Sequence, residues 1–264
     1  MRRPTMDVRS TPIRVVVVTL DAHLAGGFER AARNLTRRLP GLQVGFHVAA
    51  DWDGDPASLE RCRADIDRAD ILVAHMLFMD EHIRAVLPWL ARRAAVCDAF
   101  VGCMSGKEVA ELTRMGRFRI DGEESGLMAR LRSFRRRKAD PTKPGSAGSR
   151  QAAMLRHIPN LLRFLPGTAQ DLRAYLLTMQ YWLAGSEENV EHMIAFLIDR
   201  YAAGPRAALR GKVEHALPIR YPAEGLYHPA LAGRLSEDPR DLPRRRGDGS
   251  QATVGLLLMR SYVL

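Results

Sequence analysis

Two cysteines, a lysine and a glutamate surround a short glycine turn in the stretch VCDAFVGCMSGKEVAELTRMG, residues 96–116. A phosphate-binding loop of the form G-x-x-x-x-G-K-[ST] uses its backbone N–H groups to hold phosphate and its hydroxyl to bind Mg²⁺. Here Gly102 and Gly106 are one residue too close, and Glu108 stands where the hydroxyl is required. A carboxylate at that position repels phosphate. The turn is therefore not expected to bind ATP.

The same stretch has a simpler structural interpretation. Cys97 and Cys103 lack the C-x-x-C spacing of redox and zinc sites, so both are expected to be buried small side chains. Ser105 precedes Glu108 by three residues, which is the pattern of a capping box and predicts a helix over residues 105–115. Three cysteines at unrelated spacings indicate a reducing compartment, the cytoplasm.

The residues around this turn belong to an alternation of strands and helices. The run IRVVVVTL is typical of a strand buried on both faces. Repeated βα units predict an α/β fold with a doubly wound parallel sheet of the Rossmann or flavodoxin type. The expected strands are residues 13–20, 42–48, 70–77 and 96–103, and the expected helices are residues 28–39, 56–68, 81–94 and 105–115.

Ligands of such sheets bind beyond the carboxyl ends of the strands. The candidate contact residues at these ends are His75, Met76, Met104 and Ser105. His75 could equally be a hydrogen-bonded interior histidine. Asp21, after the first strand, is expected to cap the first helix. No G-x-G-x-x-G follows that strand, so a dinucleotide cofactor is not expected.

Metal-ligand patterns are weak in this sequence. The stretch DWDGD, residues 51–55, has some of the acidic spacing of a calcium loop. Its twelfth position is Cys62, where a bidentate glutamate is needed, so this stretch is expected to be a loop with helix caps. We assign no metal site and no catalytic residue to the chain.

Positive charge is concentrated in the middle of the chain. The net charge is +10, and the run RLRSFRRRKADPTKPGSAGSR, residues 130–150, contains Arg135, Arg136, Arg137 and Lys138. With Phe134 as its single aromatic residue, the run lacks the stacking platforms that single-stranded nucleic acid needs. No helix-turn-helix, RNP or zinc-finger pattern accompanies it, so nucleic-acid binding is not expected. We expect an exposed, mobile segment that trypsin cleaves early between Arg130 and Arg150. It is either a solvated basic loop or a contact to an acidic partner or substrate.

Composition divides the chain further. A first α/β domain is predicted for residues 1–128 and a basic loop for residues 129–150. A helical segment follows at residues 151–216, with helices at 151–165, 168–184 and 186–201 and with caps at Thr168–Asp171 and Ser186. An extended connection is predicted for residues 217–251. Residues 252–264 are expected to be the first strand of a further domain, cut off at its start. The sequence has no apolar run long enough for a membrane span and no signal peptide at its start.

Several strings then resemble, in order, the N-terminal part of the large, porphyrin-binding subunit of magnesium chelatase: GCMSGKEVAELTRMG, RRRKADPTKPGSAGSRQ, YLLTMQYWLAGSEENVEHMI, GLYHP and VGLLLMRSYVL. The resemblance extends over essentially all residues from Ile13 on. It implies a longer parent chain and the ATP-dependent insertion of Mg²⁺ into protoporphyrin IX, the committed step of chlorophyll and bacteriochlorophyll synthesis. ATP hydrolysis in that family belongs to partner subunits of the AAA+ and integrin-like types.

Alternatives to this interpretation remain open. The cobaltochelatase large subunit shares the architecture, so cobalt is a possible metal of the parent enzyme. The chain could also be a non-catalytic, stand-alone module that binds porphyrin or an acidic partner. The family's metal-insertion residues are expected outside these residues, so the chain alone is expected to be inactive and to bind no cofactor of its own.

Overall fold

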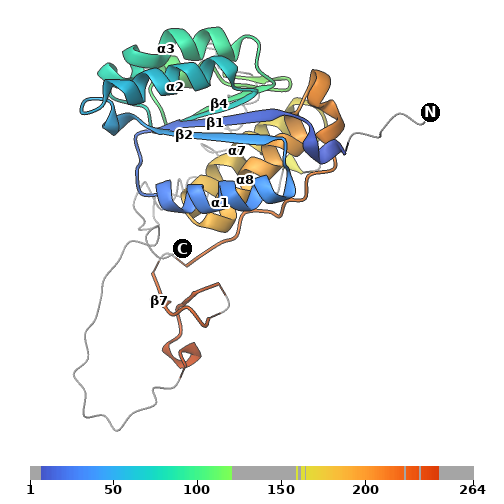
Figure 1. Ribbon diagram of the computed structural model, residues 1–264. Helices are drawn as coiled ribbons and strands as arrows, with labels where there is room; N and C mark the ends of the chain where they lie inside the picture. The colour runs from blue at the N-terminus through green and yellow to red at the C-terminus, as the bar shows by residue number, and fades with distance from the viewer. Residues whose placement is uncertain are drawn as a thin grey trace, which may run out of the picture.

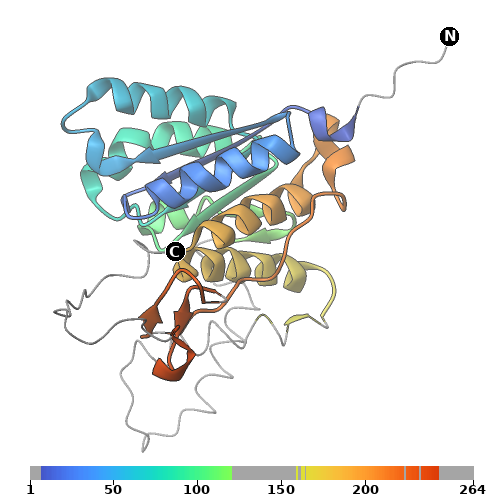
Figure 2. The same cartoon turned by 60° about the horizontal axis from the view of Figure 1, so that its bottom comes forward.

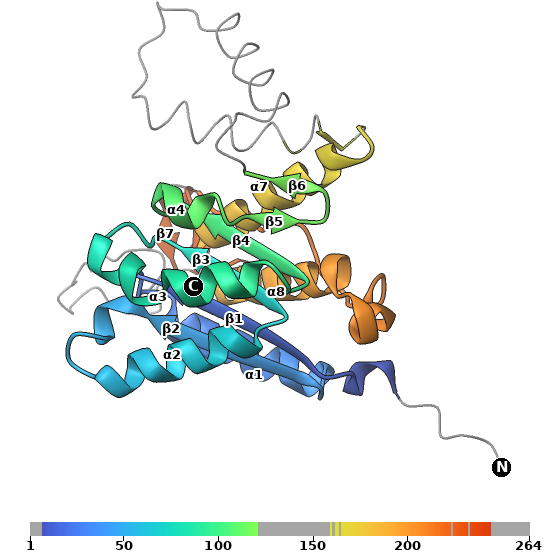
Figure 3. The same cartoon turned by 90° about the horizontal axis from the view of Figure 1, so that it is seen from above.

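The computed structural model describes residues 7–120, 159, 162–163, 165–222, 224–231 and 233–243. Its centre is a six-stranded sheet with the strand order β2-β1-β3-β4-β5-β6 (Figure 3). The first four of these strands are parallel, and the last two form an antiparallel hairpin at one edge. The predicted doubly wound α/β sheet is confirmed. The strands are β1 (Ile13–Thr19), β2 (Leu42–Val48), β3 (Ile71–His75), β4 (Ala99–Cys103), β5 (Arg114–Met115) and β6 (Phe118–Arg119).

Helices cover both faces of the sheet (Figure 1). Because side chains alternate along a strand, Val15 and Val17 of β1 pack into one layer, and Val16 and Val18 into the other. The helices on the second face are α2 (Pro56–Arg68) and α3 (Asp80–Ala94). The helices on the first face are α1 (Ala25–Arg38), α7 (Thr168–Ala184) and α8 (Glu187–Tyr201).

The helix predicted for residues 105–115 is wrong beyond one turn. Only α4 (Lys107–Ala110) is helical, and its N-cap is Gly106, with no side-chain hydrogen bond, so the capping box at Ser105 is wrong too. The Ser105 hydroxyl instead accepts a hydrogen bond from the N–H of Leu77 at 3.1 Å. The serine joins two strand ends and is not free to cap a helix.

Contacts with β4 explain why this helix stops. The Thr113 hydroxyl bonds both the N–H and the C=O of Gly102, at 3.0 and 3.1 Å. The backbone at Val109 comes so close to Gly102 that a Cβ atom there would lie 2.3 Å from the Val109 carbonyl oxygen. Only glycine permits this approach, and the chain then turns back as β5.

Two predicted caps on the other helices have opposite outcomes. Asp21 does not cap α1, whose N-cap is Leu24 without a side-chain hydrogen bond. Its carboxylate accepts the N–H of His23 at 2.9 Å and so closes a turn before the helix. The cap at Ser186 is confirmed, because its hydroxyl accepts the N–H of Asn189 at 3.2 Å.

Helix α8 lies beside α1 on the sheet (Figure 2). Arg30 pairs with Glu187 at 2.6 Å, and Arg38 pairs with Glu191 at 2.5 Å. The Asn34 amide also donates to Glu187, at 3.1 Å. The helical segment therefore closes the core under the first βα unit, more than 150 residues after it in the chain.

The remaining elements are short: η1 (Val8–Ser10), η2 (Ala49–Asp51), η3 (Gly204–Leu209), β7 (Leu226–Tyr227), β8 (Leu235–Ser236) and η4 (Pro239–Asp241). The described part of the predicted extended connection contains the β7–β8 pair and η4. The predicted basic loop, most of the helix at 151–165 and the final strand lie outside the described residues. Within the described ranges, no helix is both long and apolar enough to cross a membrane.

Candidate functional site at the carboxyl ends of the strands

His75 is the last residue of β3 and pairs in register with Thr19 of β1 on one side and Cys103 of β4 on the other. The strand β2 lies on the far side of β1, whereas β3 and β4 follow on the near side. The strand order therefore reverses between β1 and β3. Such switch points are where doubly wound sheets bind their ligands, so His75 occupies the position that the fold favours for a site.

The His75 ring is buried, with 1% of its surface exposed, and stacks on Trp182 of α7 with 4.2 Å between ring centroids. Neither imidazole nitrogen has a hydrogen-bond partner among the described residues, nor has the indole N–H. Burial lowers the pKa of His75 to about 3, so the ring is neutral at physiological pH. His75 is thus an interior histidine, but the expected hydrogen bonds are missing.

The next two predicted residues hold unusual backbone conformations. Met76 and Met104 follow β3 and β4 and have φ values of 54° and 51°, in the left-handed region that non-glycine residues rarely adopt. The Ser105 hydroxyl donates to the carbonyl of Cys103 at 3.1 Å while it accepts from Leu77. This link stabilises both turns.

Apolar side chains are exposed around these turns. Phe78, Met79 and Met104 are 51%, 41% and 48% exposed. Methionine and phenylalanine form adaptable contact surfaces. The sequence correctly predicted that His75, Met76, Met104 and Ser105 lie at the same edge; Phe78 and Met79 complete it. We call Met76, Phe78, Met79, Met104 and Ser105 the strand-end surface. His75 lies at the same edge but is buried, so it offers no exposed area for a contact.

The cysteines do not take part in this surface. Cys62, Cys97 and Cys103 are free and buried, as expected for the last two. Burial raises the pKa of the Cys97 thiol to about 11 and that of Cys103 to about 12. Both thiols therefore stay protonated and unreactive at neutral pH. The predicted contact residues Arg135, Arg136, Arg137 and Lys138 lie outside the described residues.

A second feature, which the sequence did not predict, is a pocket of about 750 Å³. Four parts of the chain build it: the residue before β4, the β5–β6 turn, the start of α7, and the end of α8 together with the residues on either side of η3. We call it the Asp171 pocket. Its lining residues are Asp98, Gly116, Arg117, Gly167, Asp171, Phe196, Asp199, Arg200, Tyr201, Ala203, Arg210, Gly211 and His215.

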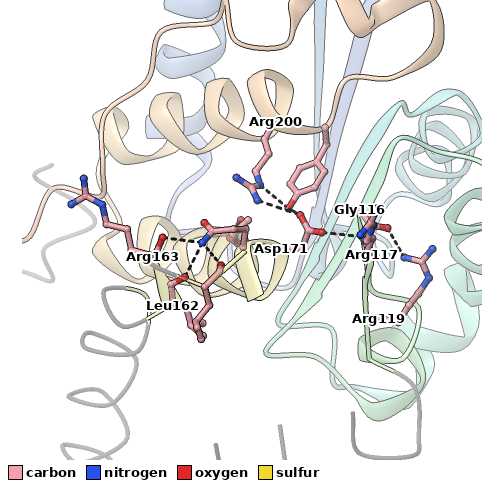
Figure 4. Close-up of polar contacts among 12 residues, drawn as sticks. Gly116, Arg117, Arg119, Leu162, Arg163, Asp171 and Arg200 are labelled. Carbon is pink, nitrogen blue, oxygen red and sulfur yellow. Dashed lines mark hydrogen bonds and ion pairs between the residues drawn. The ribbon is translucent and has the colours of Figure 1, made fainter. Parts of the chain in front are cut away.

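Asp171 organises one side of this pocket (Figure 4). Its carboxylate accepts hydrogen bonds from the Arg117 N–H at 2.9 Å and the Tyr201 hydroxyl at 3.1 Å, and pairs with Arg200 at 3.3 Å. The predicted Thr168–Asp171 cap is wrong, because the N-cap of α7 is Gly167 and has no side-chain bond. Asp171 reaches across to the hairpin instead, a long-range contact that no local pattern reveals.

Asp98 anchors the other side. Its side chain accepts two hydrogen bonds of 2.9 Å from the Arg206 guanidinium and one of 2.9 Å from the N–H of Ala203. Arg206 also lies 3.3 Å from Asp70. The hydrogen bonds to Asp98, and the charge of Asp70, raise the pKa of Arg206. These contacts attach η3 to the amino ends of β3 and β4.

Comparison with models of protein families shows to which family the chain belongs. Residues 14–176 match the family model described as a domain of unknown function, DUF3479. The chain belongs to the DUF3479 family. Residues 179–264 match a second model, CobN/Magnesium Chelatase. The resemblance to the magnesium-chelatase large subunit that the sequence motifs predicted is therefore confirmed.

Curated relatives of this DUF3479 chain are magnesium-chelatase subunits. The chain is 46% identical over 250 residues to the magnesium-chelatase H subunit of Cereibacter sphaeroides, and 43% identical over 251 residues to that of Rhodobacter capsulatus. These alignments cover 95% of this chain and 20% of each relative. The chloroplastic ChlH subunit of magnesium chelatase from Oryza sativa subsp. indica is 25% identical over 96% of this chain and 18% of its own. The chain thus spans about a fifth of the relatives it matches.

The boundary between the two family regions does not coincide with a boundary between structural domains. The DUF3479 match ends at residue 176 and the second match begins at residue 179, both inside α7. Helix α8, entirely in the second region, covers the sheet of the first. The two regions share one core in this structure.

Proposed function

We propose that the chain is part of the porphyrin-binding subunit of a magnesium chelatase, which inserts Mg²⁺ into protoporphyrin IX at the expense of ATP. The observation that carries this proposal is the 46% identity to a magnesium-chelatase H subunit over 95% of the chain. The chain's own contribution is binding: it offers contact surface for the porphyrin and for the other subunits.

ATP hydrolysis belongs, in this proposal, to AAA+ and integrin-like partner subunits. The turn after β4 supports the assignment of ATP hydrolysis to other subunits. Glu108 stands where a phosphate-binding loop needs a hydroxyl, and the helix that follows Gly106 has only one turn. Buried, protonated cysteines suit a reducing cytoplasm, where we place the complex. The metal and the nucleotide are thus handled by the assembled enzyme.

The strand-end surface is our candidate for the porphyrin or partner contact. A site for a flat apolar macrocycle needs apolar walls with a few polar groups beside them. Phe78, Met79 and Met104 provide exposed apolar area, and the cations for the propionates would come from Arg135–Lys138. Without a closed cavity around the ring, binding by this chain should be weak, about −8 kcal/mol at best, which is micromolar.

A chimera tests the proposal. The 250 aligned residues of the Cereibacter sphaeroides subunit are replaced by those of this chain, and Mg-porphyrin formation is followed with the other chelatase subunits and ATP. We expect the chimera to insert magnesium. A folded chimera that binds porphyrin but stays inactive with all subunits present would overturn the assignment.

The alternatives are separated by two further measurements. A cobaltochelatase-type parent predicts that the chimera supports Co²⁺ insertion into a porphyrin-like ring and not Mg²⁺ insertion. A stand-alone module predicts porphyrin binding by this chain that is tight and indifferent to salt, because a preformed cavity would do the work. A titration of porphyrin absorbance at low and high salt distinguishes this from the weak, salt-sensitive binding that we expect.

A further inference from the structure

We propose that the Asp171 pocket is a second binding site, separate from the strand-end surface, for an organic anion that carries carboxylate groups. Its volume of about 750 Å³ lies within the ~300–1,000 Å³ typical of small-molecule sites. The inference does not rest on the proposed chelatase function. It rests on which charges in the pocket already have partners and which do not.

All three carboxylates of the lining already have donors. Asp98 accepts hydrogen bonds from two nitrogens of Arg206. Asp171 accepts one from the Tyr201 hydroxyl and pairs with Arg200. Asp199 accepts the Val213 N–H at 2.8 Å and lies 4.0 Å from the His215 ring. Because these carboxylates already have hydrogen-bond donors or cationic neighbours, they are poor candidates for binding a further cation.

Two guanidiniums of the lining have no such partner. Arg117 projects from the β5–β6 turn and Arg210 from the end of η3, and within the described ranges neither side chain makes a hydrogen bond or ion pair. A guanidinium presents a planar fork of donors that matches a carboxylate bidentately. Two exposed guanidiniums in the lining of one pocket suit a molecule with two or more separated carboxylates.

The floor and walls are compatible with an organic body. Phe196 and Tyr201 contribute aromatic surface, and the Cβ positions of Gly167 and Gly211 face open space. Two guanidiniums on separate segments suit spaced carboxylates better than a compact dianion such as phosphate. Free polycarboxylic acids and the propionates of a tetrapyrrole share this chemistry.

The test uses the whole chain, with citrate as the probe in isothermal titration at constant ionic strength. We expect saturable binding that becomes at least about tenfold weaker in the double variant Arg117→Gln and Arg210→Gln. The matched control is Arg68→Gln with Arg84→Gln, which removes the same charge from the exposed surface of α2 and α3 and should bind citrate as the parent does. Circular dichroism verifies that all variants are folded.

Each result has a fixed meaning. No saturable citrate binding, or an equal loss in the control variant, overturns the proposal, the latter because it would show attraction by net charge alone. Protoporphyrin IX and its dimethyl ester distinguish the two sources of carboxylate. Competition with citrate by the acid but not by the ester identifies propionates as occupants, and competition by neither leaves free polycarboxylates as the ligand class. Competition by the ester as strong as by the acid contradicts carboxylate recognition.

Discussion

The Arg206 guanidinium donates two hydrogen bonds of 2.9 Å to the carboxylate of Asp98, which lies 108 residues earlier in the chain. Only 6% of the Asp98 side chain is exposed. We expect Asp98→Ala to lower the free energy of unfolding by about 2–3 kcal/mol, because it leaves a half-buried arginine and the Ala203 N–H without their acceptor. Denaturant unfolding measures the loss.

An exposed pair provides the control for that measurement. Glu29 and Arg33 on α1 form an i,i+4 ion pair at 2.6 Å with both side chains largely in solvent. Glu29→Ala should change the free energy of unfolding by less than about 0.5 kcal/mol. Similar losses in both variants would mean that the Asp98 pair does not anchor η3.

Gly116 allows the β5–β6 turn to approach Asp171. It has a φ of 57°, and a Cβ atom there would lie 2.6 Å from the Asp171 carboxylate. We expect Gly116→Ala to destabilise the fold by about 1–3 kcal/mol through backbone strain and displacement of the carboxylate. Gly54→Ala is the control, because the new methyl group meets nothing within 4 Å there. Its thermal unfolding midpoint should be unchanged or slightly higher than that of the parent.

His75 should make stability fall in acid. Its pKa is about 3 in the folded protein, against the ordinary value of 6.5, so below pH 6.5 the unfolded chain binds a proton that the folded chain does not. This contribution is absent above pH 6.5 and grows as the pH falls toward 3. At pH 5 it amounts to about 2 kcal/mol.

The variant His75→Phe isolates this effect. Phenylalanine can keep the stack on Trp182 and has no proton to bind. Burial also lowers the pKa values of His47 and His192, so the parent and the variant must be compared at each pH. Parallel stability curves between pH 8 and pH 5 would show that His75 is not the buried neutral group described above.

Truncation should reveal the shared core. A chain that ends at residue 184 loses α8 and exposes the sheet face that holds Val15, Val17 and Val73. We expect it to aggregate or to bind a hydrophobic dye without a cooperative thermal transition. A chain that ends at residue 222 keeps α8 and η3 and should unfold cooperatively. Cooperative unfolding of the shorter chain would contradict the role of α8.

Hydrophobic patterning was sufficient to predict the four parallel strands and most helices, but not the antiparallel β5–β6 hairpin at the edge of the sheet. The valine run of β1 and the spacing of apolar residues in α7 and α8 report burial directly, so their order was predictable. The strand-end residues followed from the general rule for parallel sheets. The predicted helix at residues 105–115 was wrong for a tertiary reason. The close approach of the backbone to Gly102, and the two hydrogen bonds between Thr113 and Gly102, override a good capping pattern.

The Asp171 pocket was missed for a related reason. Its residues come from segments that reach from Asp98 to His215, and Asp171 itself fits a local capping pattern that the fold does not use. One signal was present in the sequence: glycines at 116, 167 and 211 mark sharp turns. Turn chemistry alone, however, does not say that three turns meet at one place.

The position of α8 late in the chain has a consequence for the synthesis of the protein. Arg30 and its partner Glu187 are 157 residues apart, so one hydrophobic face of the sheet lacks this cover until most of the described chain has left the ribosome. At about 5–20 residues per second, that delay lasts roughly 8–30 s. During it the nascent strands present unprotected apolar surface, which makes the unfinished chain prone to aggregation. The timing of translation through residues 30–187 thus becomes part of how this protein reaches its native state.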